Sequence, residues 1–276
     1  SLELFDLNKQ ENMRYFGSLN EEEWVGDLRS SYRYGDNNLI RMGATYKDKS
    51  RTFRSTRFYY DVSRFNPEIE DIYQTSSFMG YDHIANGDIT IIRDQQPKDQ
   101  YDAGHSIYAG FIDAEYYPTA NFLMNIGVRY EYSHQWVNYA TDGGEAKRNE
   151  VNCHDFFPAM NLKYTVNDTN SLRFSFSRTV TRPSFIEMAP FLYQRIVWSS
   201  MIRGNAELKN GYNYNIDLRY ERFDQQNSNN MFSITGYAKI LEDPIERTQT
   251  LSGGAAVHSF QNADTGCGCR SGSGIP

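Results

Sequence analysis

The sequence lacks any uninterrupted apolar run of about 18 residues, the length that a membrane-crossing helix requires. The mean hydropathy of -0.69 is in the range of soluble proteins. A membrane β-barrel stays possible, because its strands are apolar on one side only and leave the average hydropathy low. The opening residues, SLELFDLNKQ, lack the basic and apolar regions of a secretory signal peptide, as expected of a mature protein or a fragment.

Cysteine and positive charge are also scarce. Three cysteines give no disulfide framework, and Cys267 and Cys269 have no second ligand pair that would complete a metal site. The formal net charge of -7 argues against nucleic acid as a partner, because phosphate binding requires clustered Lys and Arg. The closing segment GCGCRSGSGIP contains little that can pack. We therefore expect residues 267–276 to form a non-native or disordered tail.

Catalytic patterns are missing as well. Paired carboxylates such as Glu242 and Asp243 have no spacing that general acid–base chemistry demands. Cys153, His154 and Asp155 are consecutive, and neighbours on a strand point to opposite faces, so a loop-to-strand boundary is the preferred interpretation. The histidines show no H-x-x-x-H spacing for a metal. We predict that the chain is not an enzyme and needs no metal or cofactor.

What the sequence does contain is alternation of period two, which places one set of side chains on each face of a strand. In NFLMNIGVRYEY (121–132), large apolar residues occupy the even positions and mostly polar residues the odd ones. The segment YNYNIDLRYERF (212–223) repeats the pattern. Similar runs cover roughly 22–34, 39–62, 105–117, 156–166, 171–182 and 230–243, with a further short strand near 256–263.

The connections alternate between short and long. Tight turns rich in Asn, Asp, Gly and Pro are predicted at 35–38, 118–121 and 167–170, with a slightly longer one at 224–230. Long segments lie between them, at about 65–104, 141–155, 183–211 and 244–256. The fold class predicted is all-β, an antiparallel up-and-down meander. Several strands exceed the 9–11 residues of a transmembrane strand, which favours an outer-membrane barrel over a soluble sandwich with a shared core.

Three stretches carry a likeness to a known family. They are SLRFSFSRTVTRPSFIEMAPF (171–191), GNAELKNGYNYNIDLRYERF (204–223) and SITGYAKILEDPIER (233–247), which is followed by SFQNADTG (259–266). Their order resembles the C-terminal barrel half of bacterial TonB-dependent receptors, in particular those of the Bacteroidota type. The residues that carry the resemblance, here called the signature residues, are Arg178, Arg182, Pro183, Phe185, Gly204, Asn205, Asp243 and Pro244.

The resemblance implies a barrel of about 22 strands closed around a plug domain. This chain shows only eight or nine strands and no plug or coupling box, so we expect residues 1–266 to be a partial barrel that does not transport alone. The implied protein lies in the bacterial outer membrane, contacts its lipid and the TonB complex through the plug, and takes up a scarce solute such as a siderophore, cobalamin, glycan or peptide. The rival hypotheses are a soluble or surface β-rich carbohydrate-binding or adhesion protein, and an outer-membrane enzyme or passive porin.

Two more expectations concern single residues. In 178–191 we expect a strand to end and a long outer loop to begin, with Leu172, Phe174 and Phe176 facing lipid and with Arg178 and Arg182 reaching headgroups or water. Aromatic and cationic side chains in the long loops are candidates for contact with the solute, because aromatics stack on rings and Arg pairs with anions. These candidates are Tyr73, Phe78, Tyr81, Trp136, Tyr193, Trp198 and Arg203.

Overall fold

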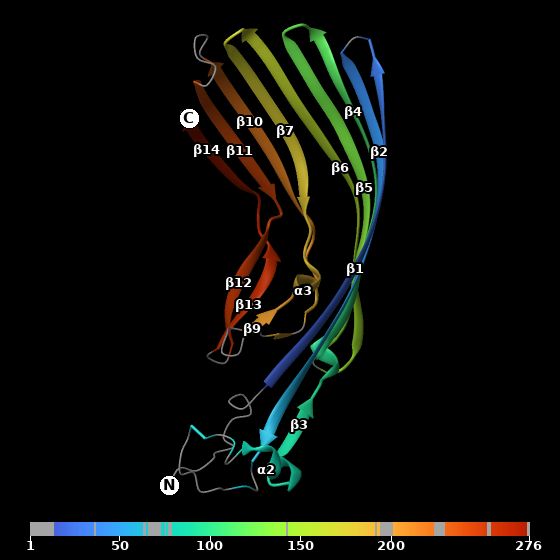
Figure 1. Ribbon diagram of the computed structural model, residues 1–276, viewed down its shortest axis with the longest axis vertical. Helices are drawn as coiled ribbons and strands as arrows, with labels where there is room; N and C mark the ends of the chain where they lie inside the picture. The colour runs from blue at the N-terminus through green and yellow to red at the C-terminus, as the bar shows by residue number, and fades with distance from the viewer. Residues whose placement is uncertain are drawn as a thin grey trace. The chain divides into compact units, whose positions relative to one another are not determined.

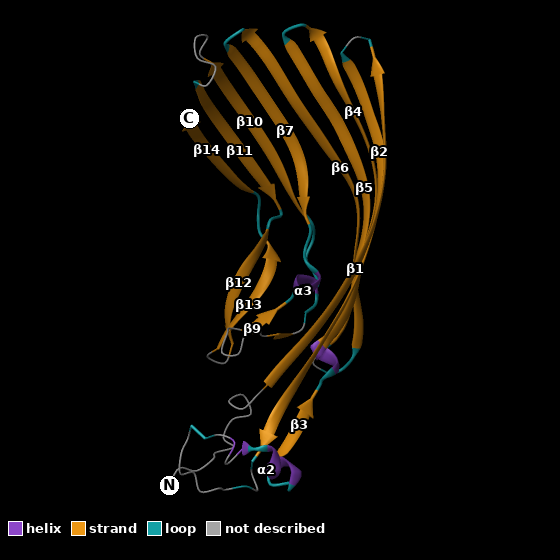
Figure 2. Cartoon of the chain, in the orientation of Figure 1, coloured by secondary structure: helices purple, strands orange, loops and turns teal. Residues whose placement is uncertain are grey.

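Strands make up most of the chain in the computed structural model (Figures 1 and 2). The structure describes residues 14–35, 37–62, 65, 73, 74, 76, 79–141, 143–190, 192–193, 201–223, 230–252 and 255–274, of which 192–193, 201, 252, 255 and 267–274 are described as backbone only. The chain divides into two compact units, which we describe in turn. The first contains residues 1–20, 51–102 and 139–147, and the second contains 21–50, 103–138 and 148–276.

One large sheet supplies the framework. Its order is β1-β2-β4-β5-β6-β7-β10-β11-β14, with β3 paired to β2, so that β1 and β14 are its two edges. Consecutive long strands are neighbours and run antiparallel in every pair for which the register is given. The long strands are β1 (Arg14–Tyr34), β2 (Asn38–Asp61), β4 (Gln100–Thr119), β5 (Phe122–Ala140), β6 (Ala146–Asn167), β7 (Asn170–Thr181), β10 (Gly211–Phe223), β11 (Met231–Glu242) and β14 (Gly266–Gly274).

The register turns the alternation of the sequence into rows that cross the sheet. One row of directly opposed residues is apolar or aromatic throughout and consists of Tyr164, Leu172, Tyr220 and Ile234. The next row is polar throughout and consists of Lys163, Arg173, Arg219 and Thr235. Successive side chains point to opposite faces of a sheet, so the second unit has an apolar face and a polar face. The predicted outward position of Leu172, Phe174 and Phe176 follows the apolar rows.

The apolar face is open to its surroundings. Large apolar side chains there are 37–51% exposed, among them Tyr108, Ile112, Ile126, Val128, Tyr130, Tyr164, Leu172, Leu218 and Ile234. A soluble protein rarely leaves so continuous an apolar surface uncovered. Such a surface is stable when it is in contact with the hydrocarbon chains of a lipid bilayer.

The short turns of the second unit lie at one end of its strands (Figure 2). Gly35 takes a positive φ of 63° between β1 and β2, which a tight turn there requires. Between β6 and β7 the Asn167 side chain accepts hydrogen bonds from the backbone N–H of Thr169 (3.1 Å) and Asn170 (2.9 Å). This Asx arrangement closes the predicted turn at 167–170.

The other end of the second unit carries a small four-stranded sheet and a short helix (Figure 1). The sheet has the order β12-β13-β9-β8, with β8 (Leu192–Tyr193), β9 (Met201–Arg203), β12 (Ile245–Ser252) and β13 (Ala255–Asn262). The helix α3 (Phe185–Met188) buries Phe185 and Met188. The predicted long segments 183–211 and 244–256 therefore contain secondary structure of their own.

The first unit is built around the outer parts of β2 and β4, with β3 (Thr90–Asp94), α2 (Tyr81–Ala85) and η1 (Pro97–Asp99). Arg54 binds Asp102 through two hydrogen bonds of 2.8 and 3.0 Å, and Arg57 pairs with Asp99. Its most buried apolar residues are Ile89 and Tyr101. No helix in the described ranges is long and apolar enough to cross a membrane.

Two expectations about strand limits are wrong. Residues 141–155 are not a long connection, because β5 continues to Ala140 and β6 begins at Ala146. Cys153, His154 and Asp155 consequently lie inside β6 and not at a loop-to-strand boundary. Residues 267–274, which belong to the expected tail, have strand backbone that pairs with β11. The division into a partial barrel and a non-native tail stays a prediction.

Candidate functional site

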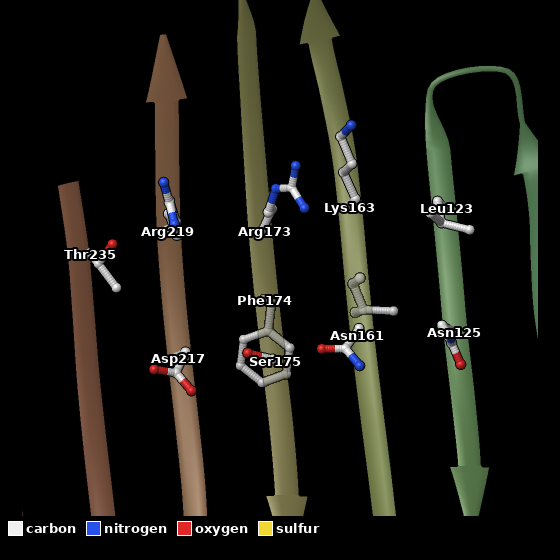
Figure 3. A pocket seen from close by; sticks show the side chains of 11 residues that line it. Leu123, Asn125, Asn161, Lys163, Arg173, Phe174, Ser175, Asp217, Arg219 and Thr235 are labelled. Atoms are coloured by element: carbon white, nitrogen blue, oxygen red, sulfur yellow. The ribbon is translucent and has the colours of Figure 1, made fainter. Parts of the chain in front are cut away.

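The polar face of the second unit bears a hollow near the short turns. It encloses about 480 Å³ and lies over β5, β6, β7, β10 and β11 (Figure 3). Hydrogen-bonding side chains dominate its lining, and those labelled on the polar face are Asn125, Asn161, Lys163, Arg173, Ser175, Asp217, Arg219 and Thr235. A volume of this size accommodates a small solute or a group of side chains.

Three cations stand side by side in this hollow (Figure 3). Lys163 is the Cα partner of Arg173, and Arg173 is the Cα partner of Arg219, so the three form one row on β6, β7 and β10. We call them the cationic row. Like charges placed directly opposite one another on a sheet repel and destabilise it unless they are neutralised.

One carboxylate partly neutralises the row. Glu221 accepts hydrogen bonds from Arg173 Nε (3.0 Å) and from the Ser171 hydroxyl (3.0 Å), and its Oε1 lies 2.9 Å from Arg219 Nε. The Glu221 side chain is 6% exposed, whereas those of Arg173 and Arg219 are 50% and 40% exposed. The two arginines of the row are thus paired with one buried anion, while their own side chains stay about half exposed.

The signature residues are brought together at the other end of the polar face, beginning with Arg182. Its Nη2 donates to Glu131 Oε2 on β5 (2.7 Å) and lies 4.0 Å from Asp155 Oδ2 on β6. Asp155 is 3% exposed and its Oδ1 accepts a hydrogen bond from the Tyr212 hydroxyl (2.6 Å). The Arg182 side chain is 17% exposed, so the expectation that it reaches headgroups or water is wrong. It instead joins β7 to two neighbouring strands.

Arg178 bridges β7 and β6 where their pairing stops. The register between these strands ends at the pair of Ala159 and Ser177, next to Pro158, which has no N–H to donate. The Arg178 guanidinium donates to the Phe156 carbonyl (2.8 Å) and lies 4.1 Å from the centre of the Tyr212 ring. A side chain therefore makes the connection that the backbone ladder does not.

The chain after β7 is anchored through backbone groups. Buried Gln135 on β5 donates to the Pro183 carbonyl (2.7 Å), and Pro183 is among the most buried side chains. Ser184 and Glu187 form a capping box that starts α3. The expected exit role of this segment is confirmed, because β7 ends at Thr181 and α3 follows at Phe185.

Gly204 and Asn205 hold the return of the chain against α3. A Cβ on Gly204 would come within 2.2 Å of the Ala189 carbonyl oxygen, so no other residue fits without movement of the backbone. The backbone N–H of Asn205 donates to the Glu187 carbonyl (2.6 Å), and its side chain donates to the Phe260 carbonyl on β13 (2.9 Å).

Asp243 and Pro244 complete the same cluster from β11. Asp243 has a positive φ of 49°, and its carbonyl accepts a hydrogen bond from the Asn262 side chain (2.8 Å). The Pro244 carbonyl accepts from the Ala263 N–H (2.8 Å). The signature residues, scattered over 67 positions of sequence (Arg178 to Pro244), thus lie near the ends of β7, β9 and β11 and in α3. Arg178 and Arg182 bond to β6 and β5, whereas Asn205, Asp243 and Pro244 bond to α3 or the end of β13. We call this cluster the signature junction.

The residues predicted to contact solute are not gathered at one place. Tyr73 and Tyr81 are 88% and 80% exposed in the first unit. Trp136 lies in β5 and not in a loop; it packs against Gly104, and Arg148 stacks on its ring at 4.6 Å. Arg203 is exposed in β9, and Tyr193 is described as backbone in β8. Phe78 and Trp198 lie outside the described residues. Contact of any of these with a solute stays a prediction.

The sequence analysis missed the cationic row and the partners of Arg182. Alternation put Lys163, Arg173 and Arg219 on a polar face, but only the register shows that they are opposed. The expectation that Cys153, His154 and Asp155 diverge is confirmed in part. Asp155 is bonded on the polar side, while a His154 ring nitrogen shares a hydrogen bond with the Tyr130 hydroxyl (2.7 Å) and the ring contacts Tyr132 in a tilted arrangement. Within the part of the chain that the structure describes, no three His, Cys, Asp or Glu side chains could hold a metal.

Aromatic rings mark a boundary on the apolar face of the second unit. Tyr46 contacts Tyr108 (ring centres 5.0 Å apart), Tyr108 contacts Tyr132 (6.2 Å), and Tyr132 contacts His154 (4.8 Å). The ladder crosses β2, β4, β5 and β6 at one level. Beyond it, on the side away from the short turns, lie polar groups such as His134 and Asn152, which are bonded at 2.5 Å. Aromatic girdles of this kind stand at membrane–water interfaces.

Comparison with known proteins agrees with this geometry. The family model described as "Outer membrane protein beta-barrel family" matches residues 68–267. The chain belongs to this family. It therefore lies in the outer membrane, where its apolar face meets lipid and its polar face lines the interior of a barrel. No curated protein matches the sequence.

Solved structures share the fold at low sequence identity. The copper transporter OprC matches with a TM-score of 0.61 and 13% identity over 93% of this chain and 35% of its own. The alcaligin outer membrane receptor FauA from Bordetella pertussis gives 0.49 and 11% over 95% and 37%, and the siderophore receptor PirA from Pseudomonas aeruginosa gives 0.43 and 11% over 95% and 56%. The chain thus spans between about a third and just over half of the length of these proteins.

Proposed function

We propose that this chain is part of the barrel of a TonB-dependent outer-membrane receptor, which takes up a scarce solute with energy supplied through TonB. The observation that carries the proposal is the signature junction. Most of the residues that resemble such receptors make hydrogen bonds or close backbone contacts where β7, β9 and β11 end or α3 begins, to partners on β5, β6, α3 and β13. Residues that merely resembled a family by chance would have no reason to converge.

The arrangement of the second unit supports uptake through the interior. A polar, hydrogen-bonding face can be hydrated and can exchange contacts with a passing solute, which an apolar core cannot. The ordered small sheet and α3 stand at the end opposite the short turns, where ligand-capturing segments of outer-membrane barrels are placed. The solute would be a siderophore, cobalamin, glycan or peptide. Exposed Arg203 is a candidate contact on this unit, and exposed Tyr73 and Tyr81 are separate candidates on the first unit.

Transport requires parts beyond this chain. In the described ranges the large sheet has ten strands, and its two edges, β1 and β14, do not pair with each other. A closed barrel removes such edges. We infer that the remaining strands, and a plug domain that engages the TonB complex, come from elsewhere in the intact receptor.

The test is uptake by cells that express the intact receptor. Growth on a limiting solute is expected to depend on the receptor and to stop when TonB is deleted or the proton gradient is collapsed. Receptor levels in outer-membrane fractions serve as the control. Uptake that persists without TonB would overturn the proposal in favour of a passive porin, and a protein that stays monomeric in buffer without detergent would overturn the membrane assignment itself.

A further inference from the structure

We propose that the cationic row, Lys163, Arg173 and Arg219, is an anion-binding step on the inner wall of the barrel, and that the solute therefore carries carboxylate or phosphate groups. The inference rests on the proposed function, because it concerns the solute that passes along the polar face. It begins from the register, which places the three cations directly opposite one another on β6, β7 and β10. Since neighbouring strands lie about 4.8 Å apart, the row extends over roughly 10 Å.

Charge in the hollow is only partly balanced. The charged residues that line it are three cations and Asp217, so their formal net charge is 3 − 1 = +2. Buried Glu221, two residues from Arg219 on β10, lowers this net charge to +1. Lys163 forms no ion pair with any described residue. Arg173 Nε donates to Glu221 (3.0 Å) and Arg219 Nε lies 2.9 Å from it, while the two arginine side chains are 50% and 40% exposed. If this part of the sheet served stability alone, we would expect an anionic residue opposite Lys163, because opposite charges on neighbouring strands stabilise a sheet.

Glu221 explains how two arginines can stand side by side. Its carboxylate, 6% exposed, accepts a hydrogen bond from Arg173 Nε and lies 2.9 Å from Arg219 Nε, on the same face of the sheet as both arginines. Guanidinium groups held in this way bind planar anions through paired N–H donors, which makes them selective for carboxylate and phosphate. Glu221 therefore acts as a positioning residue, and the cations of the row are the binding groups.

The neighbours of the row suit an anionic ligand. Asn125, Asn161, Ser175 and Thr235 line the same hollow and offer amide and hydroxyl donors around the cations (Figure 3). Asp217 lies one row away on β10 and would disfavour an anion seated over it, so the favoured position is over Lys163 and Arg173. Rings of Arg and Lys on pore walls select anions and phosphates in channels.

Binding of pyrophosphate to the whole chain in detergent micelles, followed by isothermal titration, tests the site. The unaltered chain should bind pyrophosphate, and glycerol should not bind. Lys163→Gln should weaken the binding several-fold, and Lys163→Glu should abolish it. Lys239→Gln is the matched control, because Lys239 lies on the polar face of β11 outside the hollow, and it should leave binding unchanged. Equal binding by the Lys163→Glu chain, or no binding by the unaltered chain, would overturn the proposal.

A second measurement, in the intact receptor, separates this inference from the proposed function. Lys163→Glu should raise the KM of TonB-dependent uptake at unchanged receptor level. If TonB-dependent uptake is unaffected by Lys163→Glu, the proposed anion binding by the cationic row is wrong, while the proposed function stands. If no TonB-dependent uptake is detected, the proposed function is wrong, whether or not the chain binds pyrophosphate. Protection of the Lys163 amine from an acylating reagent without any solute would show that an acidic segment of the protein covers the row, and this too would overturn the solute assignment.

Discussion

The signature junction and the cationic row both include residues of β7, but they differ in how far their cations are buried and paired with carboxylates. At the junction, Arg182 is 17% exposed and is bonded to a carboxylate that is itself 11% exposed. In the row, Arg173 and Arg219 share one buried carboxylate, and Lys163 has no ion pair among the described residues. The first arrangement holds three strands and a loop together. The second leaves cations available to something that is not part of the sheet.

The largest effect on stability should come from breaking the charge pairing at the junction. Arg182→Met would leave Glu131 with Arg129 alone and Asp155 with the Tyr212 hydroxyl alone, so buried carboxylates would lose their shared cation. Removal of one partner of a buried pair costs about 3–5 kcal/mol. The free energy of unfolding in detergent, from urea titration, measures the loss.

Arg41→Met is the matched control for Arg182→Met. Arg41 also binds a carboxylate on the polar face, Asp113 at 2.7 Å, but the two side chains are 38% and 22% exposed. We expect a cost of about 1 kcal/mol or less, because solvent screens such a pair. Equal losses for Arg182→Met and Arg41→Met would contradict the distinction between a structural junction and an open wall.

The second effect concerns backbone packing at the junction. Gly204→Ala would place a Cβ 2.2 Å from the Ala189 carbonyl oxygen and 2.7 Å from that of Ile186, and α3 would have to move. Overpacking of this kind costs about 1–3 kcal/mol. Gly236→Ala on β11 is the control, since a Cβ there meets nothing within 4 Å. Proteolysis after Arg203 should become faster in the Gly204→Ala chain only; similar rates in both chains would show that the close approach carries no cost.

The sequence predicts features that depend on alternation within one strand better than features that depend on the register between strands. Alternation alone located β7, β10 and β11 and their two faces, because side chains of a strand point up and down by geometry. It could not show that Lys163, Arg173 and Arg219 are opposed, since register joins residues far apart in sequence. The end of β7 at Thr181 was predictable from Pro183. The burial of Arg182 was not, because Asp155 belongs to the part of β6 where the sequence predicts a long connection, and Glu131 is 51 positions away in sequence.

A third effect, smaller again, tests the bridge between β6 and β7. Arg178→Gln would remove the hydrogen bond to the Phe156 carbonyl and the stacking on Tyr212, and we expect a loss of about 1–2 kcal/mol. Arg178→Lys keeps the charge and should retain part of the stability. The readout is amide hydrogen exchange of β6 around Phe156, which should accelerate locally. Unchanged exchange there would mean that Arg178 does not replace the missing backbone pairing.

The smallest effect on stability is expected for Lys163, whose charge has no partner within the sheet in the described ranges. Lys163→Gln removes a cation with no ion pair in the described ranges, so the free energy of unfolding should change by no more than about 0.5 kcal/mol. It should even rise slightly, because repulsion from Arg173 disappears. Arg173→Gln, by contrast, withdraws a hydrogen bond from buried Glu221 and should destabilise the fold measurably. If Lys163→Gln destabilised the chain as much as Arg173→Gln, Lys163 would be a structural residue, and the row would resemble the junction instead of contrasting with it.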